Sequence, residues 1–285
     1  MAINWFPGHM NKARREIRKV MGKVQLIIEV LDARIPFSSE NPLVSGLRRD
    51  TPCIKVLNKR DLADPRITNE WLAYFRAQKQ MTAIAVHKGE TKKIKKLLDI
   101  GKKMLPKDRS QIKATTAMIL GIPNVGKSTL INILAGRTIA KTGNVPAVTK
   151  RQQQVLLKNN IVLLDTPGFL WPKLTPKSCG YRLAITGAIK DAVIEYPDIA
   201  GFAADYFLKA CPESLKTRYK LSSLPADGEQ FLLELGRRRG CMAKGGVVNV
   251  QKASEILIRE YRQGLLGPIS LEAPADIARE QQQEK

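Results

Sequence analysis

The stretch GIPNVGKSTL, residues 121–130, decides the fold, because its spacing of glycine, lysine and serine is typical of a phosphate-binding loop. The apolar segment TTAMIL precedes it and a helical pattern follows it, as such a loop requires. Backbone N–H groups, the helix N-terminus and the Lys127 ammonium can together hold β and γ phosphates, and the Ser128 hydroxyl can bind Mg²⁺. The residues expected to contact a nucleotide here are Asn124, Val125, Gly126, Lys127, Ser128 and Thr129.

A second motif, Asp165-Thr166-Pro167-Gly168, ends the strand-like segment IVLLD. A carboxylate at a strand tip can hold a metal ion through water, and the Gly168 N–H can meet a γ phosphate. Thr149 lies between the two motifs and is the natural switch residue, although it could also be an ordinary loop threonine. The predicted Mg²⁺ set is therefore Ser128, Thr149 and Asp165.

A third motif, NKRD at 58–61, follows the apolar strand CIKVLN. The Asp61 carboxylate can accept two hydrogen bonds from the N1/N2 edge of guanine, which adenine cannot supply. With Asn58 and Lys59 it predicts GTP and GDP as ligands, the alternative being a simple polar turn. After the next strand, residues Ala85, Val86 and His87 are further candidates for backbone contact to the base.

The guanine motif comes before the phosphate loop, which inverts the usual order of a GTPase. The apolar runs VQLIIEVLDA, CIKVLN and TAIAV alternate with helical segments, so we expect an α/β fold with a doubly wound, mainly parallel sheet. Because domain termini commonly lie close together, a circular permutation is permitted, with 106–113 as the joining connector. The order predicts a circularly permuted P-loop GTPase.

The strand pattern stops after about residue 178. Beyond it, two apolar sets recur at helical spacing: Ile199, Phe202, Ala203, Tyr206 and Phe207, and Val250, Ala253, Ile256, Leu257 and Tyr261. We therefore expect a GTPase domain over 1–177 that begins with a basic helix over about 10–23, a small all-α domain over 178–270, and a polar tail over 271–285.

The chain of 285 residues carries a formal net charge of +22, which favours a polyanionic partner such as nucleic acid. Any one basic run could be a solvated helix face, but together they predict RNA contacts from Arg14, Arg15, Arg18, Arg237, Arg238, Arg239 and Lys244. No apolar run reaches the roughly 18 to 20 residues that span a bilayer, and the N-terminus lacks the core of a signal peptide. We expect a cytoplasmic protein without membrane insertion.

The cysteines at 53, 179, 211 and 241 show no CxxC pairing, and the chain has only two histidines. Reduced thiols are expected, the alternative being a structural zinc on Cys179, Cys211 and Cys241.

The segments WFPGHM (5–10), DARIPFSSENP (32–42), NKRD, GIPNVGKST and DTPG together resemble the RbgA/YlqF family of circularly permuted GTPases, over nearly the whole chain. The resemblance implies a GTPase domain followed by a helical RNA-binding domain, which binds the large ribosomal subunit and its rRNA and acts late in the assembly of that subunit. Release would follow ribosome-stimulated GTP hydrolysis, and the protein would be monomeric away from the ribosome. Ala147 departs from the family pattern, which more often has glycine there.

The catalytic candidates are His9, Asn124 and Lys127. Phe169 stands where some GTPases have a glutamine that orients the attacking water, so help must come from elsewhere. By the resemblance, Asn124 is a candidate ligand for K⁺, unless it only shapes the loop. His9 could orient water if the N-terminal segment folds over the switches, or it could pack or contact RNA.

Two other functions stay open. One is a nucleotide-gated RNA-binding placeholder whose hydrolysis is incidental. The other is a GTPase that acts in tRNA modification or at a membrane.

Overall fold

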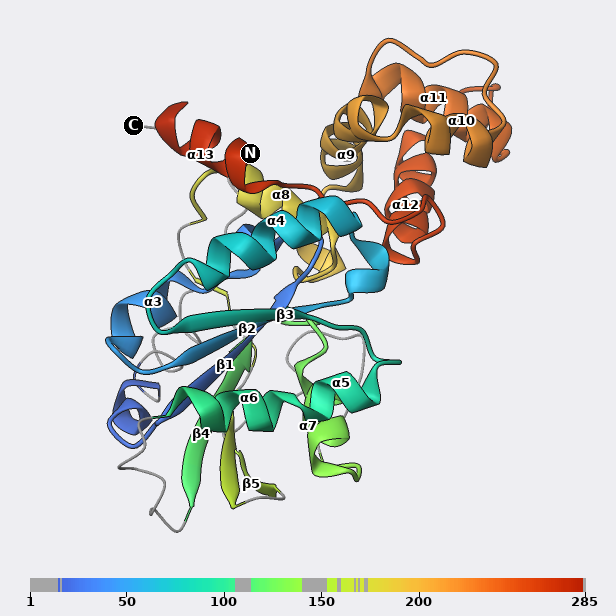
Figure 1. Cartoon of the computed structure of the whole chain (residues 1–285). Helices are drawn as coiled ribbons and strands as arrows, with labels where there is room; N and C mark the ends of the chain where they lie inside the picture. The colour runs from blue at the N-terminus through green and yellow to red at the C-terminus, as the bar shows by residue number, and fades with distance from the viewer. Residues whose placement is uncertain are drawn as a thin grey trace.

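The computed structural model describes residue 15 and residues 17–105, 114–139, 153–157, 160–166, 168, 170–171 and 174–283. A six-stranded sheet with helices on both faces is followed by a group of helices (Figure 1). The strands are β1 (Leu26–Asp32), β2 (Cys53–Asn58), β3 (Met81–Ala85), β4 (Thr115–Gly121), β5 (Gln153–Leu157) and β6 (Ile161–Asp165).

The sheet has the order β3-β2-β1-β4-β6-β5, and only β5 runs antiparallel to its neighbour. Every residue of β1 and β2 is buried, as expected for parallel strands that helices cover on both faces. The first strand in sequence, β1, lies in the middle of the sheet. The chain then runs outward through β2 to β3 and returns to place β4 on the other side of β1. The predicted doubly wound, mainly parallel sheet is confirmed.

Helices packed in the sheet region include α2 (Pro36–Ser39), α3 (Pro42–Arg48), α4 (Pro65–Arg76), α5 (Thr91–Lys95), α6 (Leu97–Met104) and α7 (Lys127–Ala135). Alternate residues of β1 face opposite sides: Ile28 packs with the apolar residues of α5, α6 and α7, whereas Ile27 packs with those of α3 and α4. Figure 1 shows the two helical layers on either side of the strands.

The start of α4 shows how local sequence sets these helices. The Asp64 side chain accepts a hydrogen bond from Arg66 N at 2.7 Å, and Pro65 occupies the first turn. Thr68, Trp71 and Phe75 then form the buried stripe, at the spacing of one helix face.

The chain continues into α8 (Ser178–Ile185), α9 (Tyr196–Ala210), α10 (Pro212–Tyr219), α11 (Gly228–Arg238), α12 (Val250–Arg262) and α13 (Pro274–Gln283). Asp227 and Asn249 cap α11 and α12 by accepting backbone N–H groups. The apolar core of α8, α9, α11 and α12 is continuous with the core on one side of the sheet. The division of the chain at residue 177 stays a prediction.

The sequence pattern left several helices of this region unspecified. Pro36 and Pro42 each begin a short helix that the apolar pattern did not reveal. The segment that follows β3 forms two helices, α5 and α6, which meet at Lys96. Of the basic helix expected over 10–23, residue 15 and residues 17–21 are helical, whereas residues up to 14 and residue 16 lie outside the described part.

Where the structure describes the expected polar tail, 271–285, it forms a helix that packs against the sheet region. Residues 274–283 form α13, which packs near α4, and Ile277 is only 4% exposed. Before it, Leu271 N donates to Arg34 O at 2.8 Å, and Trp71 Nε1 donates to Glu272 O at 3.1 Å. These contacts hold a segment of low apolar content against the sheet region.

Among the described residues, no helix combines the length and the apolar character that crossing a membrane would need.

Candidate nucleotide site

The carboxyl ends of the parallel strands bring the predicted motifs to one edge of the sheet. β1 lies between β2, which leads to NKRD, and β4, which leads to the phosphate loop. Register pairs Asp32 with Asn58 on one side of β1 and Val30 with Gly121 on the other. The topological switch point therefore falls between β1 and β4, where open α/β sheets bind their ligands.

The phosphate loop closes tightly at its two glycines. Gly126 has φ +94°, and a Cβ at this position would collide with Asn58 Nδ2. A Cβ at Gly121 would lie 2.6 Å from Val30 O. Helix α7 begins directly after Gly126, at Lys127, so its free N–H groups point toward the loop.

Asn58 joins the guanine motif to the phosphate loop. Its Nδ2 donates to the Val125 carbonyl at 2.8 Å, and both residues are buried. The two partners are 67 positions apart in the chain. The motif written first in the sequence therefore lies beside the loop written later, as the circular permutation requires.

The loops after β2 and β3 lie side by side. Arg60 N donates to Val86 O at 3.2 Å, and Glu90 Oε2 accepts from His87 N at 3.1 Å. The side chain of Asp61 is exposed in the short helix η1 (Arg60–Leu62). The segment 85–87 and Arg60, the residue before Asp61, are thus neighbours.

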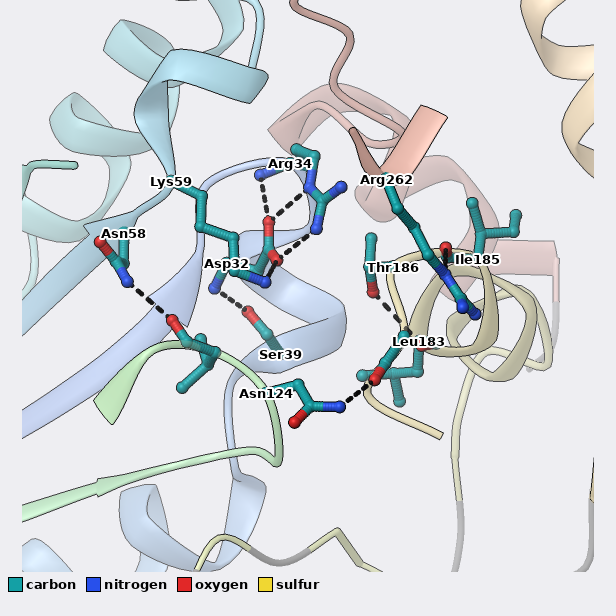
Figure 2. A network of polar contacts seen from close by, with 12 residues as sticks. Asp32, Arg34, Ser39, Asn58, Lys59, Asn124, Leu183, Ile185, Thr186 and Arg262 are labelled. Atoms are coloured by element: carbon teal, nitrogen blue, oxygen red, sulfur yellow. Dashed lines mark hydrogen bonds and ion pairs between the residues drawn. The ribbon is translucent and has the colours of Figure 1, made fainter. Parts of the chain in front are cut away.

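Lys59 points back to the end of β1. Its Nζ donates to Asp32 Oδ2 at 2.9 Å, and Arg34 donates to both oxygens of the same carboxylate (Figure 2). Burial alone would raise the pKa of Asp32, but the two cations outweigh burial and hold this pKa below its usual range.

Lys127 and Asp165 form a buried ion pair in which Lys127 Nζ donates to Asp165 Oδ1. Burial lowers the pKa of Lys127 and raises that of Asp165, while the pairing opposes both shifts. Asp165 Oδ2 is buried without a hydrogen-bond partner among the described residues. A bound phosphate group and a cation could separate this pair and satisfy each member.

Gly168 of the DTPG motif lies against the phosphate loop. Thr166 Oγ1 donates to Ile119 O at 3.0 Å. A Cβ at Gly168 would lie 3.2 Å from Pro123 N and 3.3 Å from Gly121 O. Residue 168 is therefore close to the loop that is expected to hold the β and γ phosphates.

Asn124 connects the phosphate loop to the helical region. It has φ +58°, and its Nδ2 donates to Gly187 O, just after α8, at 2.8 Å (Figure 2). Arg262 of α12 donates to Ile185 O and Ala184 O at 2.9 and 2.8 Å. The loop, the end of α8 and α12 thus form one hydrogen-bonded series.

The other predicted residues fall into two groups. Ser128 and Thr129 occupy the first turn of α7, next to the closed loop. His9, Arg14 and Thr149 lie outside the described residues.

The described arginines among those proposed for RNA contact are exposed, and three of them are partly engaged within the chain. Arg238 Nε donates to Glu234 at 2.7 Å, and Arg239 Nη2 donates to Glu260 at 2.8 Å. Arg237 Nη1 lies 3.5 Å from Glu234 Oε2. Three other exposed candidates are Arg15, Arg18 and Lys244.

Sequence reasoning assigned no role to Asp32, Arg34, Gly187 or Arg262. The DAR stretch at 32–34 gave a signal for the first two, because two charged residues directly follow an apolar strand. No comparable signal marks Gly187 or Arg262, since their contacts depend on how distant helices pack.

Comparison with known proteins agrees with this geometry. The model of a family described as "50S ribosome-binding GTPase" matches residues 116–220. The chain is 43% identical to the ribosome biogenesis GTPase A of Bacillus pumilus over 281 residues, which cover 96% of this chain and 99% of that protein. It is 32% identical to the Thermotoga maritima protein of the same name over 282 residues, 99% of this chain and 98% of that one.

Solved structures of YlqF from T. maritima are also similar to this chain. GNP-bound YlqF from T. maritima matches with a TM-score of 0.66 and 30% identity, over 93% of this chain and 99% of that one. GDP-bound YlqF matches with the same score and identity, over 92% and 100%. With its permuted nucleotide-binding edge, the chain belongs to the ribosome biogenesis GTPase A family, RbgA/YlqF, of circularly permuted GTP hydrolases.

Proposed function

We propose that this GTPase binds the precursor of the large ribosomal subunit in its GTP state and assists late assembly in the cytoplasm. It leaves as a monomer after hydrolysis that the ribosome stimulates. The observation that carries the proposal is identity of 41% to 43% with several proteins named ribosome biogenesis GTPase A, over 96% to 97% of this chain. The match therefore includes both the nucleotide site and the helical region.

The charge distribution supports rRNA as the partner. The chain carries a net charge of +22. The helical turn 17–21 and α11 lie at opposite ends of the molecule, so the basic residues near them form two separate surfaces (Figure 1). Arg15 and Arg18 belong to the first, and Arg237 to the second. Phosphate contacts of this kind predict binding that weakens steeply as salt rises.

The site residues fit a nucleotide with Mg²⁺. Asp165 Oδ2, which is buried and has no hydrogen-bond partner in the part of the chain that the structure describes, suits a cation, and Ser128 stands in the first turn of α7 as a second oxygen ligand. Thr149 is the proposed third. When bound, Mg²⁺ supplies charge neutralisation at the phosphates. Asn124 is the proposed K⁺ ligand, and its place at the tip of the phosphate loop is compatible with that role.

Lys127 supports hydrolysis by exchanging partners. In the described structure it neutralises Asp165. With GTP bound, its ammonium turns to the phosphates, where it stabilises negative charge that grows on the leaving group as water attacks the γ phosphorus. His9 is the proposed residue that orients this water. Comparing His9→Ala turnover with and without large subunits tests that role, because unchanged stimulated turnover would exclude it.

Co-sedimentation with isolated small and large subunits tests the function directly. We expect binding to large subunits with a GTP analogue and weaker binding with GDP. The variant Lys127→Ala should lose the difference between the two nucleotides. Equal sedimentation with both subunits, or with both nucleotides, would contradict the proposal.

The need for hydrolysis is a separate question, because a placeholder that binds RNA under nucleotide control requires none. The contact of Asn124 with Gly187 makes such control physically possible. We expect that neither Lys127→Ala nor a variant that binds GTP without hydrolysing it restores assembly in cells that lack the protein. Rescue by the second variant alone would favour the placeholder.

A further inference from the structure

The DARIPFSSENP stretch, 32–42, is a sequence motif for which the sequence analysis predicted no contact with the nucleotide. Asp32 is the last residue of β1, the strand between the two strands that lead to NKRD and to the phosphate loop. It is paired in register with Asn58. Its side chain is 3% exposed. A buried carboxylate at this point needs an explanation, because burying a charge costs free energy unless it is paired.

Asp32 receives donors from two cations. Arg34 donates through Nε to Oδ1 at 2.9 Å, through Nη2 to Oδ2 at 2.8 Å, and through its backbone N to Oδ1 at 3.1 Å. Lys59 Nζ donates to Oδ2 at 2.9 Å. Ser39 Oγ accepts from Asp32 N at 3.1 Å and fixes the end of the strand (Figure 2). The carboxylate is thus saturated and rigidly placed.

Lys59 occupies the strained position of the NKRD loop, residues 58–61. Its φ is +58°, a left-handed conformation that a residue with a Cβ adopts only when its surroundings enforce it. It lies between Asn58, which binds the phosphate loop, and Asp61, which is expected to read guanine. An anchor on the Lys59 side chain therefore fixes the loop between its two functional ends.

Burial and packing indicate which of the two cations, Arg34 or Lys59, would move if the Asp32 carboxylate were lost. Arg34 is 1% exposed and its guanidinium lies 5.2 Å from the ring of Tyr261, so packing holds it in place. The Lys59 side chain is 25% exposed and can turn to water. Loss of the carboxylate would leave two neighbouring cations, and Lys59 is the one free to leave.

We propose that Asp32 is a positioning residue for guanine-nucleotide binding. Its carboxylate holds Lys59, and through Lys59 the loop that carries Asn58 and Asp61, against the end of β1 beside the phosphate loop. Asp32 itself does not touch the nucleotide.

A double-mutant cycle on the full chain tests this role, with fluorescent GDP as the probe and thermal unfolding measured in parallel. Asp32→Asn and Lys59→Met should each weaken GDP binding about tenfold to a hundredfold, the range for loss of a hydrogen bond to a charged group. The double variant should bind GDP no more weakly than Lys59→Met alone, because Asp32 acts through Lys59. If the two losses multiply in the double variant, the proposal is overturned.

Glu29→Gln is the matched control, because Glu29 is on the same strand, fully buried and paired with Lys55 Nζ at 2.6 Å. It should lower the unfolding midpoint without changing GDP affinity. If Asp32→Asn only lowers the midpoint in the same way, Asp32 is structural and the proposal fails.

Should Asp32→Asn not fold, the same cycle is run with Asp32→Glu. This variant keeps the negative charge but moves the carboxylate relative to Lys59. It should weaken GDP binding in the Lys59 background and have no effect in the Lys59→Met background. Equal effects in both backgrounds would overturn the proposal.

Discussion

The hydrogen bond from Asn58 to the phosphate loop gives the clearest quantitative prediction. Asn58 is 6% exposed and Val125 is 1% exposed, and the bond between Nδ2 and the Val125 carbonyl measures 2.8 Å. In Asn58→Ala the carbonyl keeps its buried place and loses this donor. The alanine side chain also leaves empty the space beside Gly126 that the amide fills.

The magnitude follows from the cost of an unsatisfied buried group, about 1 to 3 kcal/mol. If the bond serves chiefly to hold the phosphate loop in its binding conformation, that cost appears as a loss of GDP affinity of about fivefold to 150-fold. The free energy of unfolding of the nucleotide-free protein should fall by no more than the same amount.

Fluorescent GDP titration and urea unfolding of the same preparation measure the two quantities. Gln25→Ala is the control, since Gln25 Oε1 accepts from Thr116 N at 3.0 Å, at the end of β4 away from the phosphate loop. It should reduce stability and leave GDP affinity unchanged. Unchanged GDP affinity in Asn58→Ala would refute the reasoning, as would an equal loss in Gln25→Ala.

Three further predictions concern the surroundings of the site. A hydrogen bond from Arg60 lowers the pKa of Glu90 from 4.5 to about 2. This pair therefore stabilises the fold above pH 4.5, and its contribution is lost as pH falls through about 2. Because Arg60 is partly exposed, the effect is about 1 kcal/mol or less, and acid titration of stability in Glu90→Gln should lack it. Arg262→Ala leaves Ile185 O at the end of α8 without its side-chain donor, whereas Ala184 O keeps a hydrogen bond from Gly187 N, so calorimetry should show that the free energy of unfolding falls by about 1 to 3 kcal/mol. Removal of 268–285 deletes the bond from Ile269 N to Leu62 O, and we expect weaker GDP binding and a lower unfolding midpoint.

The sheet and the phosphate loop could be predicted because their signals are local. Continuous apolar runs at strand length mark β1 and β2, which are buried throughout. The glycines at 121 and 126 follow from the close backbone approach that the loop requires. The meeting of the NKRD and phosphate-loop motifs could also be predicted, because parallel strands bring their carboxyl ends to one edge.

The remainder depends on contacts between distant segments. Helix α13 has Ile277 as its one buried residue, too weak a pattern to distinguish a docked helix from a tail. The role of Asp32 could not be predicted, because its contact with Lys59 depends on the order of the strands in the sheet. The contact of Asn124 with Gly187 requires α8 to end next to the phosphate loop, and no spacing in the sequence states this.

The most direct test of the permuted site is to change the base preference by a substitution at Asp61 and to show that the same nucleotide depends on Lys127 for its phosphates. The Asp61 carboxylate should accept from the N1/N2 edge of guanine, whereas an amide at this position can donate to the carbonyl that xanthine carries there. Titration with GDP and xanthosine diphosphate should show preference for GDP in the wild type and for xanthosine diphosphate in Asp61→Asn, with Lys127→Ala losing both. If Asp61→Asn still prefers GDP, then NKRD does not read the base of the nucleotide whose phosphates Lys127 holds.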